Sequence, residues 1–361
     1  MRYFALNLTA VSPLAIRADH APGGVASTSH IAGSALVGSL AATYRLFHDD
    51  DVADFENLFL REHVQYPHLY PATFENSYIQ NALSQPVYPA PLSARTCKRH
   101  EGFRGAQDDD FGDEHHGVRD SLFDWALFKL ARGAGDGRST AELLTILSRQ
   151  KECSVCGKAM KPFSAFYRRN PQGARQMMAA VAHTRVQTYT GIDRETGTVQ
   201  EGILYSRQVF KEQTRFWGMA KVPEVLAGTF TDFVNQVGES GLLRMGTGRT
   251  RGLGKVKLNA LPLDEEPYGF AAFRQRLEAF DRAFREQAEA IKLALQPGHF
   301  YFALTLHSPA ILRDELLRYR SSINEETLAE LMRPAGLPAD SFRAIYQAAD
   351  IRGVTGWNEL W

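Results

Sequence analysis

The most informative stretch of the sequence is Tyr3-Phe-Ala-Leu-Asn-Leu-Thr-Ala-Val-Ser-Pro-Leu-Ala-Ile-Arg17. It recurs, with few changes, near the other end of the chain as Tyr301-Phe-Ala-Leu-Thr-Leu-His-Ser-Pro-Ala-Ile-Leu-Arg313. In both copies a β-prone apolar run is followed by Ser-Pro, which is typical of a strand that ends in a turn. The two copies are separated by almost the whole chain, far beyond the periods of solenoid repeats. The sequence therefore predicts two related units, each opening on a strand.

The residues between the two copies predict a complete unit of mixed structure. Periodicity and turn residues indicate a helix over 33–47, hairpin strands over 185–190 and 199–210, a helix over 223–237, and short strands over 242–245 and 256–260. With the opening strand, this is the order β-α-β-β-α-β. The predicted fold class is therefore α+β, with a ferredoxin-like unit that carries a large insertion after its first helix.

The chain has 361 residues, more than a single core usually supports, and we expect it to divide. Residues 1–264 form the first unit, and 91–170 are its insertion, with helices predicted over 118–131 and 141–149. A long connecting helix is predicted within 265–297. Residues 298–361 then form a partial second unit, because no counterpart of the hairpin or of the glycine-rich turn precedes Trp361.

Composition excludes several classes of protein. Hydrophobic residues make up 44% of the chain and charged residues 23%, which indicates a globular protein. Lys and Arg together number 41, as do Asp and Glu, so any nucleic-acid surface has to be a local patch. Three cysteines cannot form a closed disulfide set, and the apolar run over 31–47 is too short and too polar to span a bilayer. We expect a cytoplasmic protein without a membrane partner.

A basic turn is the first candidate site. Gly246-Thr-Gly-Arg-Thr-Arg-Gly-Leu-Gly-Lys-Val-Lys257 contains four glycines and four basic residues, and no acidic residue lies between Gly241 and Lys257. Glycines allow backbone N–H groups to approach phosphate oxygens, and arginines add bidentate hydrogen bonds. The turn is therefore predicted to hold a nucleic-acid backbone, with a solvated glycine-rich hairpin as the alternative.

Cysteine spacing predicts a structural zinc site in the insertion. Cys153-Ser-Val-Cys156 can supply two thiolates from one tight turn, which is half of a tetrahedral Zn²⁺ site. Cys97 is the third candidate, and a redox role is disfavoured because no thioredoxin-like context surrounds the pair. The fourth ligand has to come from a nearby histidine, which leaves His100, His115 and His116.

Three motifs in order resemble those of a known superfamily. Gly33-Ser-Ala-Leu-Val-Gly38, the hairpin from Gly191 to Ser206, and the turn from Gly246 to Gly254 resemble the RAMP superfamily of CRISPR effector subunits. The chain is most similar to the Csx-ten family of type III-D systems, in the Cas-five-like group. The stretches Pro91-Leu-Ser-Ala-Arg-Thr-Cys97, His116-Gly-Val-Arg-Asp120 and Cys153 to Cys156 resemble that family's zinc-binding insertion, which favours His116 as the fourth ligand.

The resemblance implies an RNA-recognition fold whose glycine turn and hairpin hold the repeat-derived 5′ handle of the crRNA in antiviral defence. It also implies assembly with a large Cas-ten-type subunit and with Cas-seven-type backbone subunits. The shortened second unit suggests either a split gene or another chain that completes it. The residues it places on RNA are Gly33, Ser34, Arg185, Arg194, Arg244, Gly246, Gly248, Arg249, Arg251, Gly252, Gly254 and Lys255.

Catalysis is not expected. RAMP subunits that cut target RNA place an aspartate in an Asp-x-Pro-Val-like loop after the first strand, whereas this chain reads Ala18-Asp-His-Ala-Pro22 there. The alternative is a metal-independent endoribonuclease that matures crRNA, with His20 or His30 as the general base on a ribose 2′-hydroxyl.

Overall fold

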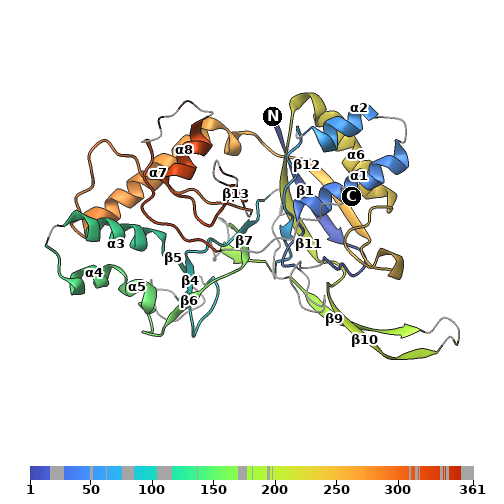
Figure 1. Ribbon diagram of the computed structural model, residues 1–361, viewed down its shortest axis with the longest axis horizontal. Helices are drawn as coiled ribbons and strands as arrows, with labels where there is room; N and C mark the ends of the chain where they lie inside the picture. Colours follow the sequence, from blue (N-terminus) through green and yellow to red (C-terminus); the bar gives the residue numbers. More distant parts are fainter. Residues whose placement is uncertain are drawn as a thin grey trace.

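A four-stranded antiparallel sheet forms one side of the molecule, seen on the right of Figure 1 in a computed structural model of the chain. The structure describes residues 1–16, 28–48, 52–61, 63–74, 85–103, 116–135, 137–169, 177–180, 182–192, 196, 198–308, 310–313, 316, 318–333, 336, 338 and 341–350. The sheet has the order β12-β1-β11-β2. Its strands are β1 (Arg2–Ala10), β2 (Tyr70–Pro71), β11 (Arg215–Val222) and β12 (Val256–Pro262).

β1 is one of the two inner strands of the sheet and is paired along most of its length on both sides. It pairs with β11 from Arg2↔Val222 to Thr9↔Arg215, and with β12 from Phe4↔Pro262 to Ala10↔Val256. Its even-numbered apolar side chains face two helices, α1 (Gly33–Phe47) and α6 (Ala227–Ser240), in one buried cluster. α1 has the bounds that the sequence predicts, and the helix predicted over 223–237 begins as the short 3-10 helix η3 (Glu224–Leu226).

The opposite face of the sheet is covered by residues of the insertion and of the segments before and after it. Ala5 and Trp217 lie there in a second apolar cluster with Phe74 and Val87. The sheet is therefore buried on both faces: the odd-numbered Ala5 and Asn7 of β1 are buried as well as the even-numbered Phe4, Leu6 and Leu8.

Close packing of α6 on β12 depends on one glycine. A Cβ atom at Gly238 would lie 1.7 Å from the carbonyl oxygen of Leu258. The helix can approach the strand this closely only because residue 238 has no side chain.

The predicted hairpin strands are not part of the central sheet, which corrects the expected assignment. β9 (Thr184–Ile192) and β10 (Val199–Phe210) form a separate two-stranded sheet that projects from the molecule (Figure 1). The register shifts between Val199↔Ile192 and Leu204↔Thr190. β11, which the sequence analysis did not assign, takes the place beside β1. Of the strand predicted over 242–245, only an isolated bridge between Arg244 and Lys255 forms.

The insertion combines two small sheets and three helices. The sheets have the orders β5-β4-β6 and β3-β7-β8. Its elements are β4 (Ala94–Cys97), β5 (Val118–Asp120), α3 (Leu122–Ala134), α4 (Thr140–Ile146), α5 (Ser148–Lys151), β6 (Met160–Pro162) and β7 (Phe166–Arg169). The outer strands of the second sheet, β3 (Tyr88–Pro89) and β8 (Met177–Ala179), lie just before and just after 91–170. The helix predicted from residue 118 begins at Leu122, because 118–120 pair with β4 instead.

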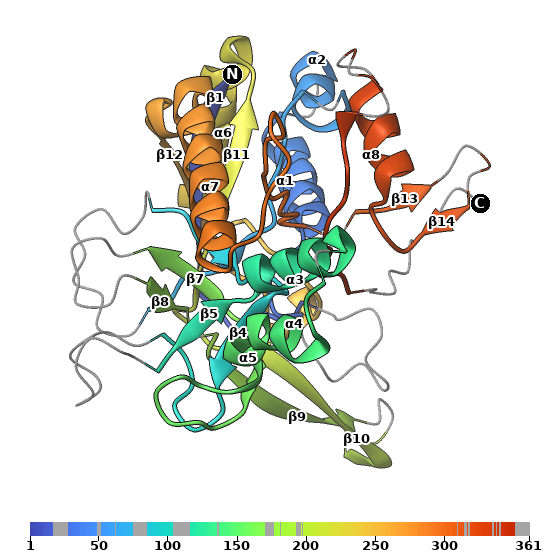
Figure 2. The same cartoon turned by 90° about the vertical axis from the view of Figure 1, so that its left-hand side faces the viewer.

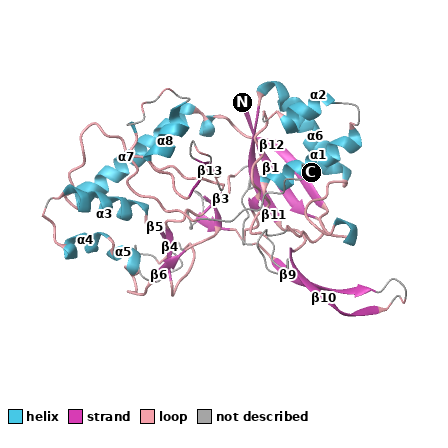
Figure 3. Cartoon of the chain, in the orientation of Figure 1, coloured by secondary structure: helices cyan, strands magenta, loops and turns pink. Residues whose placement is uncertain are grey.

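The long connecting helix, α7 (Phe270–Ala290), packs on α3 in a separate buried cluster (Figure 2). Figure 3 shows α3, α4, α5 and α7 gathered on the side away from the four-stranded sheet. The remaining short helices are α2 (Val52–Phe55), the π-helix η2 (Glu56–Leu60), and the 3-10 helices η4 (Arg249–Arg251) and η5 (Glu266–Tyr268). No helix among the described residues is long and apolar enough to cross a membrane.

The second copy of the opening strand does not form a strand, which contradicts the sequence expectation. Residues 301–308 carry no strand assignment. The elements described after them are the two-residue strands β13 (Leu312–Arg313) and β14 (Tyr319–Arg320) and the helix α8 (Glu325–Met332). β13 and β14 pair only with each other.

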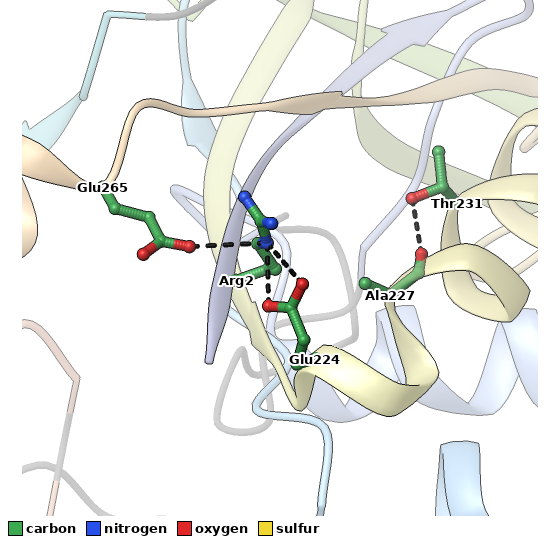
Figure 4. A network of polar contacts seen from close by, with 5 residues as sticks. All are labelled: Arg2, Glu224, Ala227, Thr231 and Glu265. Carbon is green, nitrogen blue, oxygen red and sulfur yellow. Dashed lines mark hydrogen bonds and ion pairs between the residues drawn. The ribbon is translucent and has the colours of Figure 1, made fainter.

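The start of β1 is tied to two neighbouring segments by Arg2 (Figure 4). Its Nε atom lies 2.8 Å from Glu224 Oε2, in η3, and 3.4 Å from Glu265 Oε1, beyond β12. The hydrogen bond from Arg2 lowers the pKa of the Glu224 carboxyl. Because these side chains are exposed, the ion pairs add little to the free energy of folding. Their main effect is to orient the start of β1 against its neighbours.

Candidate nucleic-acid interface and metal centre

The glycine-rich turn is built from four residues in the left-handed region. Gly246, Gly248, Gly252 and Gly254 have φ values of 74°, 78°, 81° and 83°. Residues with a Cβ atom rarely adopt this conformation. The turn folds back on itself, because the N–H of Met245 donates to the carbonyl of Gly254 at 2.8 Å.

The turn is fixed against the segment that follows β1. The N–H of Thr247 donates to Ala15 O at 2.9 Å, and the N–H of Gly254 donates to Pro13 O at 2.9 Å. A Cβ atom at Gly246 would lie 2.2 Å from Ala15 O. The N–H groups of Thr247 and Gly254 therefore already have partners within the protein. A phosphate at this turn would have to be bound by other groups, such as the side chains of the turn.

Two arginines extend from the turn into solvent. Arg249 and Arg251 flank Thr250 in the short helix η4, and both are exposed. Neither forms an ion pair with a described residue. Their positive charge is therefore available to an external anion.

The base of the hairpin lies beside the turn and adds residues that the sequence analysis missed. Arg251 Nη1 donates to the hydroxyl of Tyr205, and Arg207 Nη1 lies 3.3 Å from Thr247 Oγ1. Val209 and Leu253 are buried together beneath them with Ala15. The period-two alternation of β10 places Tyr205, Arg207 and Val209 on one face, but only the tertiary packing shows that this face meets the turn.

The other residues predicted to contact RNA have varied surroundings. Lys255 is half-buried, and its backbone pairs with Arg244. Arg185 forms an ion pair with Glu212 at 2.8 Å, and Arg194 lies outside the described residues. RNA contact by these residues stays a prediction.

Gly33 and Ser34 open α1 at a different place. The N–H of Gly33 donates to Nδ1 of His68 at 3.2 Å, whereas Ser34 is exposed. A Cβ atom at Gly33 would lie 3.1 Å from Pro67 O. The glycine thus serves the close packing of α1 on the residues before β2.

The insertion brings together three cysteines and one histidine that could hold a metal ion. The ligand atoms of Cys97, His116, Cys153 and Cys156 all lie within 4.8 Å of one another. Cys97 Sγ and Cys156 Sγ are 3.7 Å apart, and Cys153 Sγ is 3.4 Å from His116 Nδ1. For Zn–S bonds of about 2.3 Å and Zn–N bonds of about 2.0–2.1 Å, tetrahedral geometry requires separations close to these. The set is compatible with zinc.

Local backbone structure positions the metal ligands. Cys97 ends β4, and His116 lies two residues before β5, the strand that pairs with β4. Cys153 and Cys156 lie in a tight turn closed by the N–H of Gly157, which donates to Cys153 O at 2.8 Å. Burial opposes ionisation of the Cys97 thiol, but hydrogen bonds from the backbone of His100 and Arg99 and from the neighbouring thiols lower its pKa overall.

Of the three candidate histidines, His116 belongs to this group. His100 lies outside it, with its ring tilted by 31° against the ring of His116 at a centroid distance of 4.1 Å. His115 lies outside the described residues, which leaves its position untested.

A second histidine cluster is formed by His30, just before α1, and His68, just before β2. The ring of His30 contacts His68 edge-on at a centroid distance of 5.0 Å and Tyr70 at 5.7 Å. Burial lowers the pKa of His68. Asp19 and His20 lie outside the described residues.

Comparisons with known proteins give distant similarities. No protein-family model and no curated protein matches the chain. It is similar to a chain in the cryo-EM structure of the Type III-B Cmr-beta bound to cognate target RNA, with 13% identity, a TM-score of 0.32, and coverage of 72% of this chain and 97% of that one. It is also similar to oligomeric Cmr4 from Pyrococcus furiosus, with 12% identity, a TM-score of 0.30, and coverage of 73% and 100%. TM-scores this low do not establish a shared fold, so the function has to be argued from the chain's own residues.

Proposed function

We propose that this protein is a non-catalytic RNA-binding and scaffolding subunit of a type III CRISPR effector complex, and that it holds the 5′ handle of the crRNA. The observation that carries the proposal is the acid-free turn, which presents Arg249 and Arg251 beside Tyr205 and Arg207 of the projecting hairpin. Planar guanidinium groups next to aromatic rings suit the phosphates and bases of single-stranded RNA.

The proposal includes a ferredoxin-like core. The sheet order β12-β1-β11-β2, with α1 after β1 and α6 between β11 and β12, supports a β-α-β-β-α-β unit in which the insertion and hairpin follow β2. We assign the chain to the Csx-ten family within the Cas-five-like group on its three sequence motifs. The proposed protein partners are a Cas-ten-type large subunit and Cas-seven-type backbone subunits.

A salt titration of RNA binding tests the proposal. Arg249→Ala with Arg251→Ala should weaken binding of a single-stranded repeat RNA. It should also flatten the dependence of log K on log salt by about 0.7 for each phosphate that the variant no longer neutralises. The matched control is Arg274→Ala with Arg282→Ala, which removes the same charge from the exposed face of α7. Equal affinities and slopes for the two double variants would overturn the proposal.

The bound metal is proposed to be one structural Zn²⁺ per chain, held by Cys97, His116, Cys153 and Cys156. Closed thiolate-rich sites contribute directly to folding free energy. Cys153→Ser should therefore lower both the zinc content, measured by elemental analysis, and the melting temperature. His100→Ala is the control and should retain zinc. Metal-free wild-type protein after chelator-free purification would contradict the site.

The alternative of an endoribonuclease rests on His30, which contacts His68 and Tyr70. We expect repeat RNA to remain intact with the purified protein, with or without Mg²⁺. Cleavage that is lost in His30→Ala with unchanged RNA binding would establish the alternative.

A further inference from the structure

Two tyrosines form a stacked pair at the base of the hairpin. Tyr189 and Tyr205 are directly opposite in the β9–β10 register. Their ring centroids are 5.4 Å apart and their planes differ by 16°. The Tyr189 hydroxyl donates to Gln187 Oε1 at 2.7 Å, which holds the first ring in place.

The basic turn is joined to the second ring. The guanidinium carbon of Arg251 lies 5.6 Å from the ring centroid of Tyr205, and its Nη1 atom donates to the Tyr205 hydroxyl. Arg207, two residues along the same strand face, reaches Thr247. The hairpin face and the turn therefore form one continuous surface of aromatic rings and guanidinium groups.

A purely structural role does not account for this surface. Cross-strand aromatic pairs do stabilise hairpins, by about 0.2–1 kcal/mol. Neither tyrosine, however, belongs to an apolar cluster of the described residues, and both are only partly buried. No described carboxylate pairs with Arg251 or Arg207. The surface thus combines partly exposed aromatic side chains with positive charge that no described carboxylate neutralises.

We infer that Tyr205 and Arg251, with Tyr189 behind them, form a stacking site for one unpaired nucleobase of a single-stranded RNA. This inference rests on the proposed RNA-binding function and specifies what part of the RNA the hairpin base receives. The base stacks on the aromatic and guanidinium planes, while Arg249 contacts the adjacent phosphate. Because every base has a π face, this contact tolerates any sequence.

The test compares the single-stranded repeat RNA with strands in which a single base of it is replaced by an abasic ribose, scanned position by position. Wild-type protein should bind one abasic strand more weakly than the rest. Tyr205→Leu should lose about 5- to 150-fold in affinity for the intact strand, corresponding to about 1–3 kcal/mol for one stacked base. It should also bind the intact strand and that abasic strand equally. Tyr205→Phe, which keeps the ring, should retain the discrimination.

The salt dependence of the RNA affinity distinguishes a stacking contact from an electrostatic contact with phosphate. Tyr205→Leu removes no charge, so its salt slope should equal that of the wild type, whereas Arg249→Ala should flatten the slope. Leu204→Ala is the matched control, since Leu204 lies at the adjacent position on the opposite, exposed face of β10.

The outcomes distinguish the two proposals. A wild-type protein that binds RNA with no abasic-sensitive position, and a Tyr205→Leu variant of wild-type affinity, would overturn the stacking site and leave the RNA-binding proposal in place. A wild-type protein that binds no single-stranded RNA would overturn both.

Discussion

β1 and the segment 301–307 have nearly the same sequence and opposite environments. Phe4, Leu6 and Leu8 of β1 are 5%, 0% and 0% exposed. The matching residues Phe302, Leu304 and Leu306 are 44%, 57% and 49% exposed. The alternation of side chains is common to both copies, so the sequence alone does not distinguish them.

The difference lies in what surrounds each copy. β1 is hydrogen-bonded to β11 and β12 and is covered by α1 and α6. The second copy is held by contacts at its two ends: the N–H of Tyr301 donates to Asp281 Oδ1 at 2.8 Å, and the carbonyl of His307 accepts from the hydroxyl of Tyr70. A β-prone sequence becomes a strand only when neighbouring strands pair with it and a helix covers its apolar face.

Amide hydrogen exchange should show the largest contrast between the copies. The amides of Leu6 and Leu8 lie in a strand paired on both sides, so we expect them to exchange only on global unfolding. Amides over 302–306 should exchange orders of magnitude faster, as measured by mass spectrometry on overlapping peptides. Comparable protection of the two segments would mean that 302–306 acquires strand partners in solution.

The next largest contrast is expected in the free energy of unfolding when one leucine in each copy is replaced by alanine. Leu6→Ala should reduce the free energy of unfolding by about 2–5 kcal/mol, because it leaves a cavity in the core. Leu304→Ala should cost less than about 1 kcal/mol, since that side chain is more than half exposed. Urea midpoints measure both, and an equal loss from the two variants would contradict the contrast.

How well the fold could be predicted varies along the chain. The bounds of α1 were predicted correctly, because its small and apolar residues follow the helical period without interruption. Cys97, His116, Cys153 and Cys156 are brought together as the motifs suggested. β11 was missed because its pairing with β1 joins residues far apart in the sequence. The longer alternating run of β10 therefore looked like the better candidate for the strand beside β1. The contact between Tyr205 and Arg251 was also missed, because the two residues meet only through tertiary packing.

The contact of α6 with the strand beside β1 can be tested with two glycines of the same helix. Gly238→Ala should destabilise the protein by about 1–3 kcal/mol, because its Cβ atom would displace β12. At Gly228 an added Cβ meets nothing within 4 Å, so Gly228→Ala should be neutral or stabilise by up to about 1 kcal/mol. Thermal denaturation distinguishes them, and a stabilising Gly238→Ala would show that α6 does not rest on Leu258.

The smallest effect concerns the helix that covers β1. Nδ1 of His68 accepts the N–H of Gly33 at the start of α1, and burial lowers its pKa. The unfolded chain, in which a histidine has a pKa of about 6.5, therefore binds more protons than the folded chain in mildly acidic solution. Stability should fall as the pH falls through about 6.5, by at most about 1.4 kcal/mol per pH unit from this group.

Urea midpoints above and below that pH measure the effect. His68→Gln should reduce the pH dependence, whereas His299→Gln, an exposed change beside the second copy, should leave it unaltered. An unchanged pH dependence in His68→Gln would assign it to other groups.

The register shift in the hairpin has a consequence for how related sequences can vary in length. Between the shift and the molecular body, each residue of β10 is opposite a fixed partner, from Leu204↔Thr190 to Phe210↔Thr184. One residue inserted or deleted within that paired stretch would turn Tyr205 and Arg207 to the opposite face. Changes of length beyond the shift, toward the tip, are absorbed there and leave that face unaltered. Natural relatives should therefore differ freely in the length of the hairpin tip and keep an invariant number of residues from Leu204 to Phe210.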